Sequence, residues 1–291
     1  MLIQLREFLL NGLTGSHPQR VLNNPPGQEI PPAPMERLDE ALRLLLNRLI
    51  GDAISPDGKE VDYQWLRSSS LFTRDFRNLT IALNRFDPPQ LRSRAEQICF
   101  WINLYNVLAL HAVIELNVRN SVSEGWGGLA FFRQAAYCVG GQRLSLDDIE
   151  HGILRANRGH PFLPGPQFAK NDPRLAWALP RVDVRIHFAL NCASRSCPPI
   201  GVYRPTHLDQ QLDLAAAHFV EQDIERVGET GLRLSSIFRW YQQDFGGVEG
   251  VIDFLLRFLP AGDPRRGWLV ENRRSVNLLY RPYDWQLNRL R

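Results

Sequence analysis

Two cysteines and one histidine lie within the stretch Val184–Pro199, which reads VRIHFALNCASRSCPP. A cysteine thiolate is a nucleophile and a redox centre, and a nearby histidine can take up the proton of the thiol. His187 is therefore a candidate base for Cys192 or Cys197. Cys192 is slightly favoured as the nucleophile because it lies closest to the end of the predicted strand. Two neighbouring thiols are also candidates for a reversible disulfide, in which one attacks and the other resolves.

A catalytic histidine needs a third group that holds its ring in place. Asp284, near the end of the chain, and Asn191 are the candidates for this role. In a regular strand His187 and Cys192 face opposite sides, because side chains alternate. Their pairing therefore requires a bend at Asn191, whereas Cys197 lies beyond the loop and is free of that constraint.

The element expected to position these groups is a buried strand over residues 184–190. Apolar residues occupy every second position there, which is the pattern of a strand with one buried face. Arg185 lies with His187 on the polar face and is a candidate substrate-binding or orienting residue. The pair Pro198-Pro199 prevents the strand from continuing, because proline lacks the backbone donor.

A long helix is predicted over Gln90–Asn117, and most of its circumference is apolar, so it should be a buried central helix. Asn103 and Asn106 lie three residues apart on one face of it. Buried amides must find hydrogen-bond partners, and bracing of neighbouring backbone is the simpler interpretation. The alternative is that one of them orients a catalytic group or donates to a developing oxyanion.

A second group of polar residues follows a predicted hairpin over residues 131–146, whose Gly140-Gly141 pair suits a tight turn. Ser145 and Asp148 resemble a capping box, so a helix should begin there. Glu150 and His151 lie one turn inside it and are candidate substrate-binding or orienting residues. Glu150 is a candidate base or orienting group for a histidine, although an ion pair with a neighbouring arginine explains it equally well.

The remaining pattern predicts an α+β fold, with a helical N-terminal half packed on a small, mostly antiparallel sheet. Residues 1–50 are expected to form a helical extension with a proline-rich linker over 23–34, and residues 51–291 a single domain. An irregular connection is expected over 158–180. Helices are expected over residues 2–13, 35–50, 61–86 with breaks, 207–222, 235–246 and 248–259, and strands over 231–234 and 276–280. The leucines of the first two helices suit a core or a docking surface for a partner protein.

Composition argues for an ordinary globular protein of 291 residues, with 44% hydrophobic and 22% charged residues and a formal charge of +3. No basic stripe suggests nucleic acid, and no apolar run is long enough for a membrane span. Arg6 and Glu7 interrupt the apolar N-terminus, so a signal peptide is not expected. We therefore expect a cytoplasmic location. In that compartment the four cysteines should mostly be thiols, with Cys192 and Cys197 as the exception that stays open. No zinc, phosphate-loop or dinucleotide pattern is present, so neither a metal nor a cofactor is expected.

Four motifs together resemble the family called domain of unknown function 547. They are FWINLYN at 100–106, LSLDDIEHGILR at 144–155, RIHFALNC with SCPP at 185–199, and YDW at 283–285. The resemblance covers about residues 85–290 and implies a shared fold without an established activity. A papain-like or transglutaminase-like arrangement is the expectation for that fold. Ala193 stands where glycine is usual and Val184 where proline is, and a turn with positive φ would be strained at Ala193.

Three functional hypotheses follow. The first is a cysteine-dependent hydrolase or acyl transferase that uses Cys192 or Cys197 with His187 and Asp284 on a small-molecule or peptide substrate. The second is a thiol redox protein, for which glutathione is a natural partner because an exposed thiolate would meet it. The third is an interaction module without enzymatic activity that docks a partner through its N-terminal helices.

Overall fold

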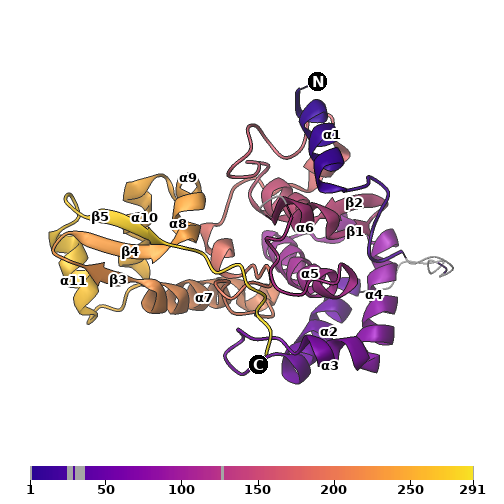
Figure 1. Cartoon of the computed structure of the whole chain (residues 1–291), viewed down its shortest axis with the longest axis horizontal. Coiled ribbons are helices and arrows are strands. Elements are labelled where there is room, and N and C mark those ends of the chain that lie inside the picture. Colours follow the sequence, from indigo (N-terminus) through magenta and orange to yellow (C-terminus); the bar gives the residue numbers. More distant parts are fainter. Residues whose placement is uncertain (1, 25–28, 30–36, 126–127, 291) are drawn as a thin grey trace.

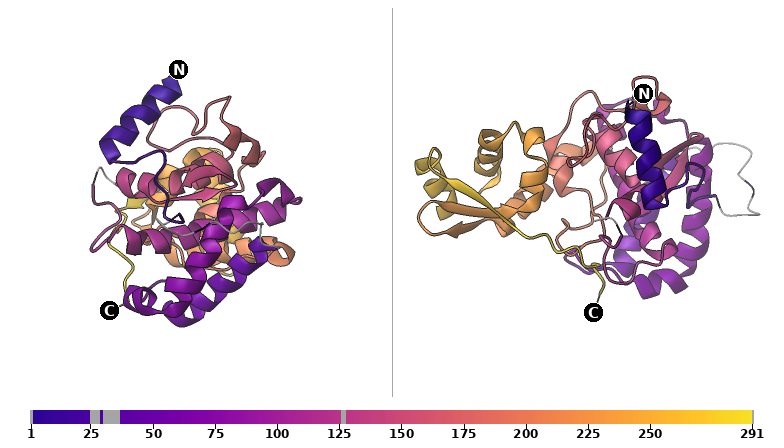
Figure 2. Two further views of the ribbon diagram at one scale, coloured as in Figure 1. Left: turned by 90° about the vertical axis from the view of Figure 1, so that its right-hand side faces the viewer. Right: turned by 45° about the horizontal axis from the view of Figure 1, so that its top comes forward.

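Two lobes with separate hydrophobic clusters make up the protein (Figure 1). The computed structural model describes residues 2–24, 29, 37–125 and 128–290. The cluster of the N-terminal lobe runs from Leu38 to Leu212 and includes Leu287. The cluster of the C-terminal lobe contains Phe188 and residues from Ala216 to Leu269. Figure 2 shows the C-terminal lobe projecting from one side of the N-terminal lobe. Helices with two small sheets confirm the predicted α+β class.

Helix α5 (Arg94–Glu115) is the centre of the N-terminal lobe. It begins at a capping box in which Ser93 and Glu96 each accept a hydrogen bond from the other's backbone N–H. The helix is long and apolar enough to cross a membrane, and 94% of that stretch is buried inside the protein. A helix that is apolar on all sides suits such an enclosed position. The predicted buried central helix is therefore confirmed.

Helix α2 (Leu38–Ala53) packs against α5, and its leucine stripe is buried in the same cluster. The boundary expected after residue 50 lies inside α2, so this helix is part of the lobe and not of an extension. Five of its leucines are buried in the core, whereas Leu44 is exposed. The rest of this helical layer comprises α3 (Tyr63–Ser68), the π-helical turn η1 (Leu71–Phe76), α4 (Arg77–Ala82), and the 3₁₀ turns η2 (Leu83–Arg85) and η3 (Pro88–Gln90).

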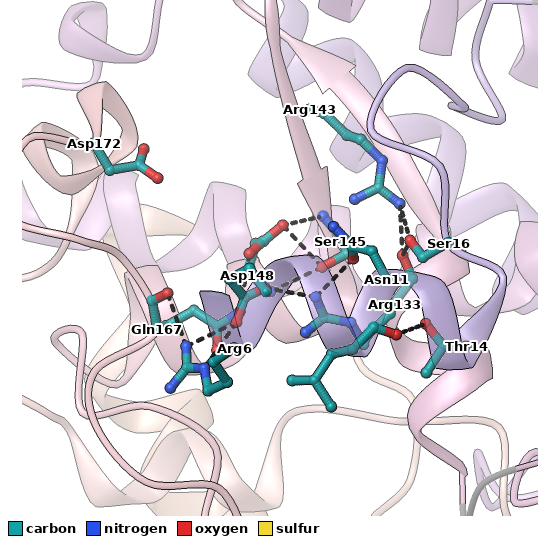
Figure 3. Close-up of polar contacts among 12 residues, drawn as sticks. Arg6, Asn11, Thr14, Ser16, Arg133, Arg143, Ser145, Asp148, Gln167 and Asp172 are labelled. Carbon is teal, nitrogen blue, oxygen red and sulfur yellow. Dashed lines mark hydrogen bonds and ion pairs between the residues drawn. The ribbon is translucent and has the colours of Figure 1, made fainter. Parts of the chain in front are cut away.

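Helix α1 (Leu2–Thr14) attaches to the lobe through polar contacts, several of which Figure 3 shows. Arg6 donates to the carbonyls of Pro164 and Pro166, and Arg133 donates to Glu7 and Asn11. The large apolar residues of this helix are exposed, namely Leu2, Leu5, Phe8, Leu9 and Leu13. Most of the linker predicted over 23–34 lies outside the described residues.

A short hairpin covers one side of α5. Its strands are β1 (Ala136–Val139) and β2 (Gln142–Ser145), which pair antiparallel around Gly140-Gly141. Helix α6 (Leu129–Gln134) occupies the start of the range predicted as hairpin. Ser145 and Asp148 form the predicted capping box, visible in Figure 3, at the π-helical segment η5 (Asp148–Leu154).

The C-terminal lobe contains a three-stranded mixed sheet in the order β3-β4-β5. Strand β4 (Gly231–Ser235) pairs antiparallel with β3 (Glu225–Val227) and parallel with β5 (Asn277–Arg281). The helices of this lobe are α8 (Ser236–Trp240), α9 (Gln242–Phe245), α10 (Val248–Phe258) and α11 (Pro264–Glu271). Helix α7 (Leu208–Asp223) follows the 3₁₀ turn η8 (Pro205–His207) and joins the lobes, because Leu212 belongs to the first cluster and Ala216 to the second.

The strand predicted over 184–190 is wrong, since the segment forms the 3₁₀ helix η7 (Val184–Phe188). The Asp183 side chain accepts from the Arg185 N–H and starts this turn. A 3₁₀ helix has three residues per turn, so residues two apart point in different directions. Ile186 accordingly packs in the first cluster and Phe188 in the second. The irregular connection before it contains one further 3₁₀ turn, η6 (Pro173–Trp177).

Candidate functional site

The two thiols of the cysteine-bearing loop lie in contact. Cys192 Sγ and Cys197 Sγ are 2.7 Å apart, and both cysteines are free and buried. A disulfide has a sulfur–sulfur distance of about 2.05 Å, so bond formation requires only a small movement. The loop therefore brings together the two cysteines that the sequence analysis selected.

Hydrogen-bond donors converge on the sulfur of Cys197. The backbone N–H of Cys192 donates at 3.0 Å, and the hydroxyls of Tyr283 and Ser194 lie at 3.3 Å. Burial opposes ionisation, but the donors from Cys192, Ser194 and Tyr283 outweigh it and lower the pKa of Cys197 to about 7. The hydrogen bond to Cys197, together with burial, holds the pKa of Cys192 well above its ordinary value. Cys197 is therefore the more acidic thiol of the pair and Cys192 the less acidic one.

Two buried asparagines hold the loop in place. Asn191 donates from Nδ2 to the Pro198 carbonyl at 2.7 Å and accepts from the Ala193 N–H at 2.8 Å. Asn106, from α5, accepts from the Asn191 N–H at 2.9 Å and donates to the Ala189 carbonyl at 3.1 Å. Both amides therefore brace backbone, and Ala193 adopts a φ of +67° within this tight turn.

His187 is held by a carboxylate of the C-terminal lobe. Its Nε2 lies 3.0 Å from Asp244 Oδ2, and Asp244 also accepts from Arg155 and Arg158 at 2.6 and 2.9 Å. Burial lowers the pKa of His187 in spite of this carboxylate. The neutral ring then donates from Nε2, and its Nδ1 is a buried acceptor without a partner among the described residues. The ring stacks on Tyr241, with centroids 3.9 Å apart.

Glu150 projects from η5 toward the same region. Its two carboxylate oxygens accept from the hydroxyls of Tyr105 at 2.9 Å and Tyr241 at 2.5 Å. These bonds fix the carboxylate between α5 and the C-terminal lobe. It is not part of an ion pair with a neighbouring arginine in the described structure, which was the alternative interpretation.

A cavity of about 60 Å³ joins these groups, which is room for a few water molecules. We call it the thiol cavity. Its polar lining includes Cys192, Cys197, His187 and Glu150. Aromatic side chains supply much of the remainder, namely Tyr105, Phe132, Trp240, Tyr241, Tyr283 and Trp285. The cavity therefore holds a thiolate, an acceptor nitrogen and a carboxylate in largely apolar surroundings.

Asp284 does not hold His187, and Asp244 has that role. Asp284 is exposed, its N–H donates to Ser196, and its carboxylate accepts from the Gln286 N–H. The loop that carries Asp284 bonds to the cysteine loop through backbone and so directs its side chain away from the cavity.

Three other predicted residues lie outside the thiol cavity. Asn103 braces the backbone of Tyr203 with both ends of its amide. Arg185 pairs with carboxylates, among them that of Asp183. His151 accepts from Arg155 at 3.0 Å and does not line the cavity.

The residues that the sequence analysis missed come from the C-terminal lobe. Asp244, Tyr241 and Tyr283 complete the site, and Tyr105 comes from the recognised motif in α5. One signal was available for Asp244, since it is a lone carboxylate among aromatic residues before the helix stop at Gly246-Gly247.

One group of possible metal ligands occurs among the described residues. Asp147, His151 and His160 offer ligand atoms within 4.8 Å of one another, and Asp147 Oδ2 is buried without a partner. The Nδ1 of His151 accepts from Arg155, so Nε2 carries the ring proton and faces Asp147 at 3.8 Å. A protonated nitrogen offers no lone pair, so a metal would first have to break the Arg155 contact.

Comparison with known proteins identifies one family. Residues 89–220 match the family described as "Protein of unknown function, DUF547". This stretch contains both cysteines, His187, Glu150 and the asparagines of α5, and the match confirms the resemblance drawn from the motifs. Neither the curated proteins nor the solved structures contain a match. The papain-like or transglutaminase-like arrangement therefore stays a prediction.

Proposed function

Because residues 89–220 belong to the DUF547 family, whose description assigns no activity, we propose a function from the geometry of the site. We propose that the protein is a thiol–disulfide exchange protein in which Cys192 and Cys197 alternate between the dithiol and the disulfide. The observation that carries this proposal is the 2.7 Å contact of the two sulfurs, one of them ringed by hydrogen-bond donors.

The chemistry follows from the different acidities of the two thiols. The Cys197 thiolate attacks one sulfur of a small disulfide, the sulfur–sulfur bond of that disulfide breaks, and one thiolate leaves. Cys192 then attacks Cys197 Sγ and releases the second half as a thiolate. The pair loses two electrons and the substrate disulfide gains them. Such exchange is fastest when the attacking thiol has a pKa near the ambient pH, as Cys197 does.

The second attack requires a base, because the Cys192 thiol keeps its proton. His187 lines the same cavity and its Nδ1 is an unpartnered acceptor. Asp244 holds the opposite nitrogen and stabilises the imidazolium that forms when Nδ1 takes the proton. Glu150 adds a fixed negative charge to the same cavity.

A cysteine-dependent acyl transfer is the second candidate, and the same histidine favours it. An imidazole that is held by a carboxylate and lines the same cavity as a reactive thiol is the combination that such enzymes use. In the described structure neither thiol is hydrogen-bonded to His187, and each instead contacts the other thiol. We therefore place this reaction second.

The experiment that tests the proposal is a redox titration of the complete chain. The protein is equilibrated in buffers of graded thiol and disulfide content, quenched with an alkylating reagent and read by mass spectrometry. We expect a reversible bond between Cys192 and Cys197. Cys99 and Cys138 serve as internal controls, since they are free cysteines away from the pair. If the bond forms under none of these conditions, the proposal is overturned.

The His187→Ala variant separates the two candidates. Thiol exchange should continue in this variant, with a slower second step, because the bond exchange itself takes place between sulfurs. Acyl transfer to or from a thioester probe should be lost, because that reaction depends on the thiol and the imidazole together. The second candidate would be favoured if the wild-type chain turns over the thioester but forms no disulfide, and if His187→Ala loses the thioester turnover.

A further inference from the structure

A second cavity reaches one member of the thiol pair, Cys197. It has a volume of about 260 Å³, and Cys197 and Tyr283 line both this cavity and the thiol cavity. We call it the basic pocket. Its other lining residues come from both lobes and include Lys59, Arg195, His218, Asp223 and Arg281.

The lining of the basic pocket carries more positive than negative charge. Lys59, Arg195 and Arg281 face a single carboxylate, that of Asp223. Lys59 Nζ donates to the neutral amide of Gln222, and Arg195 donates to that of Gln286. In the part of the chain that the structure describes, neither side chain forms a salt bridge, although Lys59 interacts electrostatically with Asp57. Lys59 is one of only two lysines in the chain.

Arg281 supplies a further unused donor. Its terminal nitrogens contact Asp223 and Glu225, but its Nε is buried without a hydrogen-bond partner among the described residues. A buried polar atom without a partner is unfavourable, and a ligand that accepts from it would remove the cost. Guanidinium groups bind carboxylates through paired donors, so a carboxylate suits this position.

We infer that the basic pocket binds the substrate of the thiol pair, and that this substrate is a small disulfide bearing carboxylates, of the size of a short cysteine peptide. The inference rests on the proposed thiol exchange and adds the substrate class. Cys197 attacks a sulfur of the bound disulfide, while Lys59, Arg195 and Arg281 hold the carboxylates and stabilise the departing thiolate. A volume of about 260 Å³ lies just below the usual range of small-ligand sites, so the pocket accommodates about one half of such a disulfide, next to Cys197.

The test compares disulfides of different charge on the full-length chain. In a Cys192→Ser background the reaction stops at the mixed disulfide on Cys197, whose rate of formation is read by mass spectrometry. The probes are glutathione disulfide, which is anionic, 2-hydroxyethyl disulfide, which is neutral, and cystamine, which is cationic. The pocket variant is Lys59→Gln with Arg195→Gln. The control variant, Lys170→Gln with Arg92→Gln, removes the same charge at exposed positions that do not line the pocket.

We expect the pocket variant to react about tenfold more slowly with glutathione disulfide and at an unchanged rate with the neutral probe, because local positive charge raises the encounter rate of anions. The control variant should change the rate with glutathione disulfide by less than about twofold, since exposed distant charges are screened. High salt should reduce the preference for the anionic probe.

The two ways of failing are distinguishable. If the neutral probe reacts but the pocket variant keeps the wild-type preference, or the control variant loses as much, the pocket assignment is overturned and the exchange function stands. If none of the three probes reacts with Cys197 and the wild-type chain forms no internal disulfide, the proposed function falls and the substrate assignment falls with it.

Discussion

At the scale of single residues, the acidity of Cys197 depends on a few donors around one sulfur. Tyr283 is the one whose side chain comes from the far end of the chain, yet its hydroxyl lies 3.3 Å from Cys197 Sγ. Hydrogen bonds to charged groups contribute about 1.5–3 kcal/mol, and about 1.4 kcal/mol corresponds to one pKa unit. A single hydroxyl can therefore change which fraction of Cys197 is ionised near neutral pH.

The Tyr283→Phe variant should raise the pKa of Cys197 by about one unit, because it removes one donor to the thiolate and keeps the ring. The measurement is the pH dependence of alkylation by iodoacetamide, read at Cys197 by mass spectrometry. Tyr280→Phe is the matched control, since the Tyr280 hydroxyl contacts Gln242 and not the thiols. An unchanged pH profile in Tyr283→Phe would show that the Tyr283 hydroxyl does not lower the pKa of Cys197.

At the scale of elements, the sequence predicts what depends on local periodicity. Helices α2, α5, α7 and α10 follow from apolar spacing alone, and the β1–β2 hairpin follows from its glycine pair. These features need no knowledge of distant residues. The position of Glu150 one turn after the Ser145 cap was predictable for the same reason.

What could not be predicted depends on contacts between the lobes. Alternating apolar residues over 184–190 satisfy a strand pattern, but Ile186 and Phe188 serve two different clusters, and only a 3₁₀ turn divides them in this way. The partner of His187 was missed because Asp244 and Asp284 both lie among aromatic residues, and the helix stop after Asp244 does not show which carboxylate reaches His187. Their difference arises from the packing of α9 against η7.

Strain in the cysteine loop is measurable at Ala193, whose φ is +67°. A left-handed conformation costs an L-residue about 1–2 kcal/mol, which glycine avoids. Glycine also loses a buried methyl and makes the unfolded chain more flexible, so Ala193→Gly alone should be nearly neutral. Ala189 is equally buried but has a φ of −115°, so Ala189→Gly relieves no strain. It only loses the buried methyl and makes the unfolded chain more flexible. We therefore expect Ala193→Gly to be about 1–2 kcal/mol more stable than Ala189→Gly in urea unfolding. Equal stabilities would mean that the loop stores no strain there.

The two asparagines of α5 provide a matched pair for the support of the loop. Each amide donates to one backbone carbonyl and accepts from one N–H, at Tyr203 for Asn103 and at the Ala189–Asn191 segment for Asn106. Asn103→Ala and Asn106→Ala should each lower the free energy of unfolding by about 2 kcal/mol, because buried backbone groups lose their partners. Only Asn106→Ala should also change the alkylation rate of Cys197. A change of the same size in Asn103→Ala would show that the effect is general loosening of the fold.

At the scale of the whole molecule, the candidate site is also the joint between the lobes. Glu150 bonds to Tyr241, and Arg155 and His187 bond to Asp244, so each contact joins the N-terminal lobe or η7 to α8 and α9. The side chain of Asp244 is fully buried at the meeting point. Asp244 therefore both holds His187 in the candidate site and joins the two lobes.

Replacement of this carboxylate tests the joint. Burial opposes its ionisation, but hydrogen bonds from His187 and Arg155 outweigh burial and hold the pKa of Asp244 well below its usual range. Asp244→Asn leaves the buried Arg155 without its anion, and breaking a buried pair costs about 3–5 kcal/mol. Urea unfolding at pH 7 should show a loss of this size. Asp284→Asn is the control and should change stability by less than about 0.5 kcal/mol, because that carboxylate is exposed.

The pH dependence of that loss has a definite sign. A depressed folded-state pKa stabilises the protein above the unfolded value, about 3.9 for aspartate, and this contribution disappears as the pH falls through the folded-state value. The difference in unfolding free energy that is due to the Asp244 carboxylate should therefore shrink progressively as the pH falls below about 4. His187, Arg155 and Arg158 face the carboxylate, and the arginines keep their charge throughout. A difference that still grows below pH 4, or an equal loss in Asp284→Asn, would contradict the assignment of Asp244 as the charged centre of the joint.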